Sequence, residues 1–135
     1  MVKHVQAAVE EYHKGAWEKS LAKAAKFLEA ALKVLLTEAA LPAQSGRQFK
    51  VDTAITDLAG NGTKGVVHDT IRLTIPRNLR FVYDVTSNRG GRHDPDEIDA
   101  NEMDATAVLS NCSWVLAEMI RYSQSQGDLA EAKSV

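Results

Sequence analysis

Apolar residues recur at helical spacing through the first forty positions of the chain. The first series predicts an amphipathic helix that Gly15 ends, and its members are Val2, Val5, Val9 and Tyr12. The second series predicts a longer helix from Trp17 to about Ala40, where Pro42 blocks it, and its members include Leu21, Ala24, Leu28, Ala31, Leu32 and Leu35. Because only two residues connect these helices, we expect them to fold back as an antiparallel hairpin.

The middle of the chain predicts shorter elements. A loop over residues 42–47 precedes a short helix over residues 51–58, and a glycine-rich turn follows over residues 60–65. Residues 66–75 are ambiguous, because apolar and polar side chains alternate there as they do in a strand. The chain offers no second run of strand character as a partner, so we expect an extended or single-turn connection.

Two further helices are predicted in the second half of the chain. Pro76 suits the first turn of a helix that runs to about Asn88 and ends before the Gly90-Gly91 pair. Asp99 followed by Glu102 resembles a capping box at the start of a final helix. That helix carries a broad apolar stripe, which predicts that it is central: Ala105, Val108, Leu109, Cys112, Val115, Leu116, Met119 and Ile120.

These periods predict an all-α bundle of four to five helices that opens with the antiparallel N-terminal hairpin. We expect a single domain over residues 1–123 and a polar, frayed tail over residues 124–135. The 135 residues are 44% hydrophobic and 25% charged, which is enough apolar material for one core without disulfides or metals. A net charge of -2 excludes a surface that is basic throughout, so any nucleic-acid contact must be local.

Cysteine and histidine usage bears on compartment and cofactors. Cys112 is the single cysteine, so it forms no internal disulfide, and its place on the apolar stripe predicts a buried thiol. The Cys and His spacing does not resemble a zinc site, and we expect neither a metal nor another cofactor. The sequence also lacks the apolar run of a signal peptide or membrane span. It therefore predicts a cytoplasmic protein without a membrane partner.

Basic and acidic residues are segregated along the sequence between residues 70 and 104. Up to His93, five arginines face one aspartate, a local charge of +4, and the next eleven residues carry six acids and no base. Acids at a helix start have an ordinary explanation, because they complement the positive end of the helix dipole. Arg72, Arg77 and Arg80 could either extend a track for RNA or form a solvated helix face.

The run from Ser87 to His93 places two guanidinium groups and one imidazole around two glycines. Glycine lets the backbone approach a ligand, arginine offers a planar fork to phosphate oxygens, and histidine moves a proton near neutral pH. These groups could cleave RNA without a metal, by activating a ribose 2′-hydroxyl against the adjacent phosphate. The residues alone leave two interpretations open, a structural loop and a phosphate or RNA site.

Residues 75–122 resemble the C-terminal domain of abortive-infection proteins, a branch of the HEPN superfamily. The resemblance rests on an Ile-Pro-Arg helix start, an Arg-Gly-x-x-His loop, and an Asn-x-Met-Asp-Ala start to a last helix that contains Trp and Ala-Glu. Residues 11–36 are similar to the opening hairpin of the same family. The resemblance implies an all-α, commonly dimeric bundle whose active members are metal-independent ribonucleases of defence or toxin systems.

The resemblance also implies roles for individual residues. His93 is the candidate acid or base, and Arg89, helped by Arg92, would hold the scissile phosphate. Asn88 would orient the substrate, while Glu29 would either approach the loop from the second helix or belong to a solvated helix face. The family motif has four to six residues between its Arg and His, whereas three separate Arg89 from His93. Either Arg89 substitutes from a shifted position or the nuclease centre has decayed.

Two hypotheses of different classes follow. In the first, the chain is an RNA-binding domain or metal-independent endoribonuclease that acts as a homodimer. In the second, it is a catalytically inactive helical module that dimerises or docks to an antitoxin or a larger defence complex. Trp17 and Trp114 are expected to anchor packing rather than to stack on bases. Since only 6% of residues are aromatic, RNA contacts should run mainly through phosphates.

Overall fold

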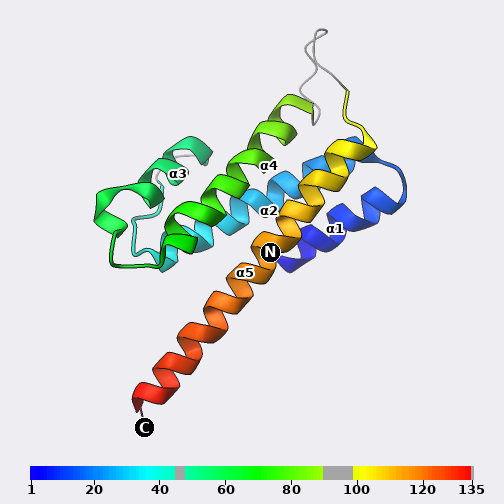
Figure 1. The fold of residues 1–135 in the computed structure, drawn as a ribbon. Helices are drawn as coiled ribbons and strands as arrows, with labels where there is room; N and C mark the ends of the chain where they lie inside the picture. Colours follow the sequence, from blue (N-terminus) through cyan, green and yellow to red (C-terminus); the bar gives the residue numbers. More distant parts are fainter. Residues whose placement is uncertain (45–47, 90–98, 135) are drawn as a thin grey trace.

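The structure is a computed structural model that describes residues 1–44, 48–89 and 99–134, with side chains up to Gln124. Five α-helices occur in this part of the chain. They are α1 (Val2–His13), α2 (Trp17–Glu38), α3 (Val51–Ala59), α4 (Ile75–Arg89) and α5 (Glu102–Ser134). The described residues include no strand, so the all-α bundle predicted from the apolar periods is confirmed (Figure 1).

Helices α1 and α2 form the predicted antiparallel hairpin (Figure 1). Gly15 makes the turn with a φ of +73°, a left-handed conformation that residues with a side chain rarely adopt. Ser20 ties the two helices together, because its Oγ donates a buried hydrogen bond of 2.8 Å to the carbonyl oxygen of Ala8. The short connection and this bond together fix how the hairpin packs.

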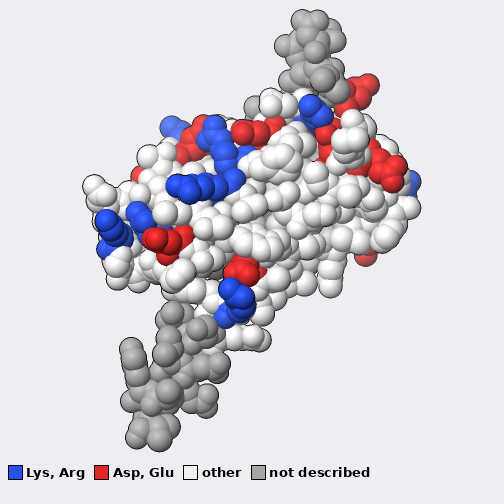
Figure 2. All heavy atoms as spheres, viewed as in Figure 1, with Lys and Arg blue, Asp and Glu red and all other residues white. Residues whose placement is uncertain are grey.

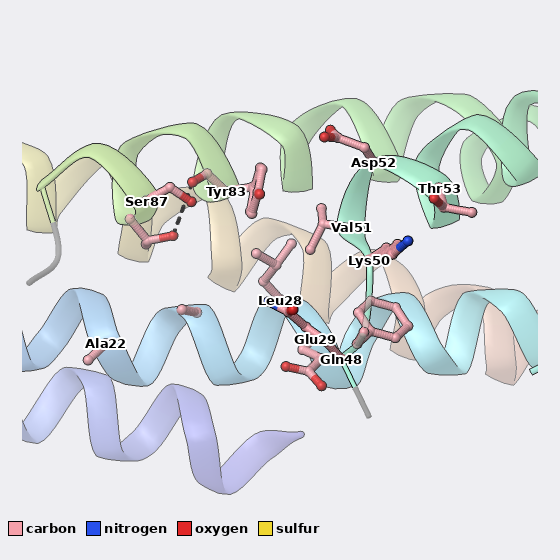
Figure 3. Close-up of a pocket in the computed structure, with 13 residues that line it drawn as sticks. Ala22, Leu28, Glu29, Gln48, Lys50, Val51, Asp52, Thr53, Tyr83 and Ser87 are labelled. Atoms are coloured by element: carbon pink, nitrogen blue, oxygen red, sulfur yellow. Dashed lines mark hydrogen bonds between the residues drawn. The ribbon is translucent and has the colours of Figure 1, made fainter. Parts of the chain in front are cut away.

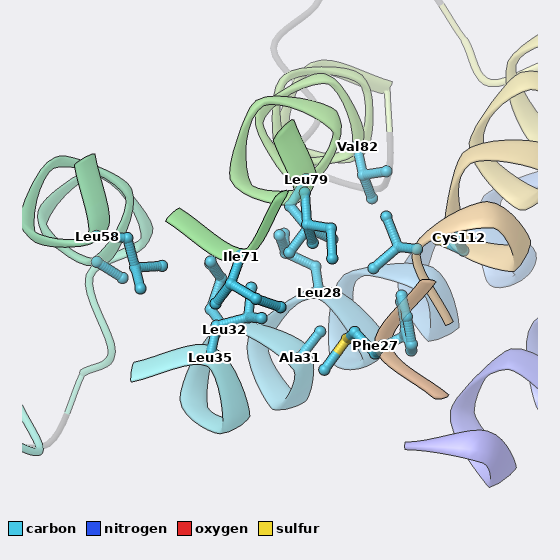
Figure 4. Packing of buried hydrophobic residues seen from close by; sticks show 14 of the residues in the cluster. Phe27, Leu28, Ala31, Leu32, Leu35, Leu58, Ile71, Leu79, Val82 and Cys112 are labelled. Carbon is cyan, nitrogen blue, oxygen red and sulfur yellow. The ribbon is translucent and has the colours of Figure 1, made fainter. Parts of the chain in front are cut away.

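Helix α2 is the centre of the bundle and contacts each of the other four helices. Its apolar side chains pack between those of α3, α4 and α5 (Figure 4). Most of the stripe on α5 is buried as predicted, up to Met119. The prediction that the final helix is the central one is nevertheless wrong, because the other four helices pack on α2 while the C-terminal part of α5 extends beyond the bundle (Figure 1).

The segment before α4 is helical rather than extended. A 3-10 turn covers Asn61–Thr63, and a π-helical turn over Thr70–Thr74 runs directly into α4. Ile71 and Ile75 are both fully buried, and a helical turn places residues four apart on the same side. Of the two predicted forms, the single-turn connection is therefore correct for residues 70–74, and the extended one is wrong.

Arg72 holds this segment in place from the inside. Only 7% of the residue is exposed, and its guanidinium donates to Thr63 Oγ1 at 3.1 Å and to Asp69 Oδ1 at 3.0 Å. It also donates to the carbonyl oxygens of Ala59 at 3.0 Å and Gly60 at 3.4 Å, just after the end of α3. Arg72 is thus neither solvated nor available to RNA, which corrects both alternatives predicted for it.

The two ends of α5 also differ from the prediction. Asn101, not Asp99, caps its first turn, because Asn101 Oδ1 accepts the backbone N–H of Asp104 at 2.9 Å. The helix then continues to Ser134, so the segment expected as a frayed tail is helical and points away from the bundle (Figure 1). Within the bundle, burial raises the pKa of the Cys112 thiol to about 12, which confirms an inert core cysteine.

Candidate functional site

The structure places three of the five predicted site residues. His93 and Arg92 lie outside the described residues. Asn88 is exposed in the last turn of α4, and Arg89 is the last residue of that helix. Glu29 is exposed near the middle of α2. The predicted site therefore divides into the end of α4 and a separate position on α2.

Arg89 forms an ion pair with Asp104 in the first turn of α5. Its Nη1 donates to Asp104 Oδ1 at 2.7 Å, and the pair joins the two ends of the connection between α4 and α5. The Arg89 side chain is 35% exposed, whereas that of Asp104 is only 10% exposed. We call this contact the α4–α5 corner.

The α4–α5 corner satisfies neither partner fully. A guanidinium carries five N–H donors, and Arg89 uses one of its groups while making no other hydrogen bond to the described residues. Asp104 Oδ2 is buried and has no hydrogen-bond partner among the described residues. Buried polar atoms without a partner are uncommon in proteins. The corner thus combines an exposed cationic group that has spare donors with a buried acid that has a spare acceptor.

An open cleft of about 800 Å³ lies beside the C-terminal half of α4. Its walls are α2, residues 48–53 and α4, and Figure 3 shows Glu29 and Ser87 on facing walls. Glu29 also pairs with Lys33 at 3.2 Å, with both side chains about half exposed. The lining of the cleft ends at Ser87, two residues before Arg89. Glu29 thus lines the same cleft as the last turns of α4, but its contact is with a lysine, and its predicted approach to the loop stays a prediction.

The remaining predicted basic residues share their surface with acids. Arg80 bridges α3 and α4, because its guanidinium contacts Asp52 and also Asp84, at 3.3 Å from the latter. Arg77 is exposed one turn earlier on α4. Figure 2 shows basic and acidic groups interleaved on this side of the molecule. Within the described residues, the arginines of α4 thus form a mixed, solvated face and not a continuous basic track.

Two features of the surface were missed by the sequence reasoning. One is Asp104 as the partner of Arg89, for which an acid at the third position of α5 facing a basic helix end is the available signal. The other is a pair of large aromatic side chains that are partly exposed, Phe81 on α4 and Trp114 on α5. Phe81 is 41% exposed and Trp114 is 39% exposed, so Trp114 is less buried than a packing anchor is expected to be. Trp17 packs edge-on against Tyr12, with ring centroids 5.3 Å apart.

Comparisons with family models, with curated proteins and with solved structures found no match to this chain. The resemblance to abortive-infection domains accordingly stays a prediction. Among the described residues, no three His, Cys, Asp or Glu side chains gather in a way that could hold a metal ion. In the same part of the chain, none of the helices has an apolar stretch of the length that a bilayer crossing requires.

Proposed function

We propose that this chain binds RNA at the α4–α5 corner and is a metal-independent endoribonuclease of the abortive-infection type, acting in antiphage defence or a toxin–antitoxin system. The observation that carries the proposal is Arg89, a partly exposed guanidinium with unused donors at the end of α4. Arginine at such a position suits a phosphate, because its planar fork matches two phosphate oxygens. The resemblance of residues 75–122 supplies the reaction and the biological setting.

The proposed reaction needs a base, an acid and a group that holds the phosphate. His93 removes the proton of a ribose 2′-hydroxyl, whose oxygen attacks the adjacent phosphorus while the bond to the 5′-oxygen breaks. Arg89 and Arg92 hold the charge that develops on the phosphate, and Asn88 orients the substrate. The departing 5′-oxygen takes up a proton, which leaves a 2′,3′-cyclic phosphate and a 5′-hydroxyl. In this account Glu29 contacts the substrate from the facing wall of the cleft.

RNA cleavage in the presence of a chelator tests this proposal. The wild-type chain should release fragments that end in cyclic phosphate, and His93→Ala should lower the rate at least about a hundredfold, as the loss of a general acid or base does. His68→Ala is the matched control, because His68 is exposed and precedes α4, at the opposite end of that helix from Arg89. Equal rates in the wild type and in His93→Ala would exclude the assignment of His93.

A second candidate function is association with a second copy through exposed aromatic side chains of α4 and α5. The supporting observation is the exposure of Phe81 and Trp114, since large aromatic side chains are enriched in protein interfaces. Such a module needs no catalytic residue, which agrees with the departure of Arg89 from the family spacing. A homodimer that leaves RNA intact would match this function and exclude the first.

The mass of the protein in solution tests the second candidate. Light scattering should give twice the 14.7 kDa of one chain, and Phe81→Ser combined with Trp114→Ser should give a monomer. Val34→Ser is the control, because Val34 has a similar exposure of 38% but lies on α2. A wild-type monomer at all accessible concentrations would exclude this function.

A further inference from the structure

Asp104 is placed to counter the positive charge of Arg89. It lies in the first turn of α5, where Asn101 caps the helix and holds the Asp104 backbone N–H. Its side chain is nine-tenths buried, and one carboxylate oxygen contacts Arg89 at 2.7 Å while the other has no partner in the part of the chain that the structure describes. Since a buried acid with one satisfied oxygen depends on that single contact, Asp104 holds Arg89 firmly in its present position.

This contact opposes the binding of an anion at the corner. A phosphate that approaches Arg89 meets the negative charge of Asp104 at the same guanidinium, and like charges a few ångströms apart repel. Arg89 cannot swing outward to avoid this repulsion, because the buried carboxylate would then lose its only cationic partner among the described residues. A phosphate that binds the spare donors of Arg89 is thus repelled by the Asp104 carboxylate, which weakens its binding.

We propose that Asp104 is a restraining counter-ion, which keeps Arg89 in place and weakens the binding of RNA phosphates at the α4–α5 corner. This inference rests on the proposed RNA function, because it concerns the strength of binding at the same residue. Asp104 does not contact the substrate in this account and is a positioning residue. The restraint allows RNA to bind strongly only where further phosphate contacts add to the one at Arg89.

The test compares the RNA affinity of the wild type with that of a variant that lacks the Asp104 charge. Asp104→Asn removes the charge and keeps an oxygen that can accept from Arg89, and it should bind RNA about tenfold more tightly than the wild type. The probe is a fluorescent single-stranded oligouridylate with 2′-O-methyl groups, which cannot be cleaved because its nucleophilic hydroxyl is blocked. Binding is followed by fluorescence anisotropy at several salt concentrations.

Two controls separate the restraint from general effects of charge. Glu102→Gln makes the same change in net charge at an exposed position in the first turn of α5, and it should change the affinity less than about twofold. Asp104→Glu keeps the charge and should not bind more tightly than the wild type. In Asp104→Asn, the slope of log K against log salt should change by less than about 0.7, the value of one phosphate contact on a single strand, because Arg89 contacts the same phosphate with and without the Asp104 charge.

A double variant identifies Arg89 as the group that is restrained. Asp104→Asn combined with Arg89→Gln should lose the gain in affinity, and a gain that persists there would overturn the proposal. A gain in Asp104→Asn no larger than that in Glu102→Gln would also overturn it, while RNA binding by the wild type would leave the proposed function standing. If neither the wild type nor Asp104→Asn binds the probe, the restraint and the RNA function both fail. Thermal unfolding by circular dichroism checks that each variant is folded.

Discussion

Arg72 and Arg89 are two arginines of one short stretch of sequence that the fold uses in opposite ways. Arg72 is 7% exposed and donates to four different acceptors, two of them backbone carbonyls. Arg89 pairs with Asp104, its one partner among the described residues, and its side chain is 35% exposed. The two arginines differ in burial and in the number of engaged donors, although both stand in the same basic segment of the sequence. A guanidinium with spare donors is the one to test for ligand binding.

Replacing Arg72 should give the largest effect on stability. Arg72→Met leaves the carbonyls of Ala59 and Gly60 without their donor in a buried setting, so we expect a loss of about 3 kcal/mol in the free energy of unfolding. Urea denaturation measures this loss. A loss below about 1 kcal/mol would show that Arg72 stabilises the fold no more than an exposed arginine does.

Replacing Arg89 should cost less and be reversible by a second change. Arg89→Met leaves the buried carboxylate of Asp104 unpaired, and we expect a loss of about 2 kcal/mol because the pair is partly exposed. Adding Asp104→Asn removes that charge and should recover about half of the loss. If the losses in the free energy of unfolding for Asp104→Asn and Arg89→Met instead add in the double variant, the two side chains do not interact energetically.

Removing the cap of α5 tests how the corner is held. Asn101→Ala deletes the acceptor for the backbone N–H of Asp104 and should cost about 1 kcal/mol. Asn111→Ala is the control, because Asn111 donates only to a carbonyl within its own helix and its loss should be close to neutral. Equal effects of the two changes in urea denaturation would contradict the assignment of Asn101 as the cap.

The smallest effect is expected at the exposed partner of Arg72. Asp69 pairs with Arg72 at 3.0 Å, but its side chain is 70% exposed, so Asp69→Asn should cost only about 0.5 kcal/mol. Asp57→Asn, at an exposed position on α3, should cost nothing measurable. A loss at Asp69 as large as that at Arg72 would mean that the ion pair, and not the carbonyl contacts, holds the segment.

The helices could be predicted from the sequence because each carries a local period. The alternation at residues 71–75 was misleading, since the same apolar positions also suit a helical turn that buries Ile71 and Ile75 together. Asn101 and Asp99 are equally good caps in isolation, and the place where α5 begins decides between them. Trp114 stands beside an apolar stripe, yet its exposure depends on how α4 and α5 meet.

The candidate site was less predictable because its contacts join distant parts of the chain. Glu29 on α2 and Ser87 on α4 line one cleft, a relation that local sequence does not encode. The pairing of Arg89 with Asp104 joins residues that are fifteen positions apart in the sequence, and it depends on where α4 ends and α5 begins. The predicted roles of His93 and Arg92 fall outside the described residues and stay predictions.

The affinity of Arg89→Gln for uncleavable RNA tests the central claim most directly, that Arg89 is the phosphate-binding group of the corner. The account predicts that Arg89→Gln weakens binding of the 2′-O-methyl probe about tenfold. Arg121→Gln, which makes the same charge change at a side chain that is 79% exposed on α5, should weaken it far less. Equal and small losses in the two variants would contradict the claim.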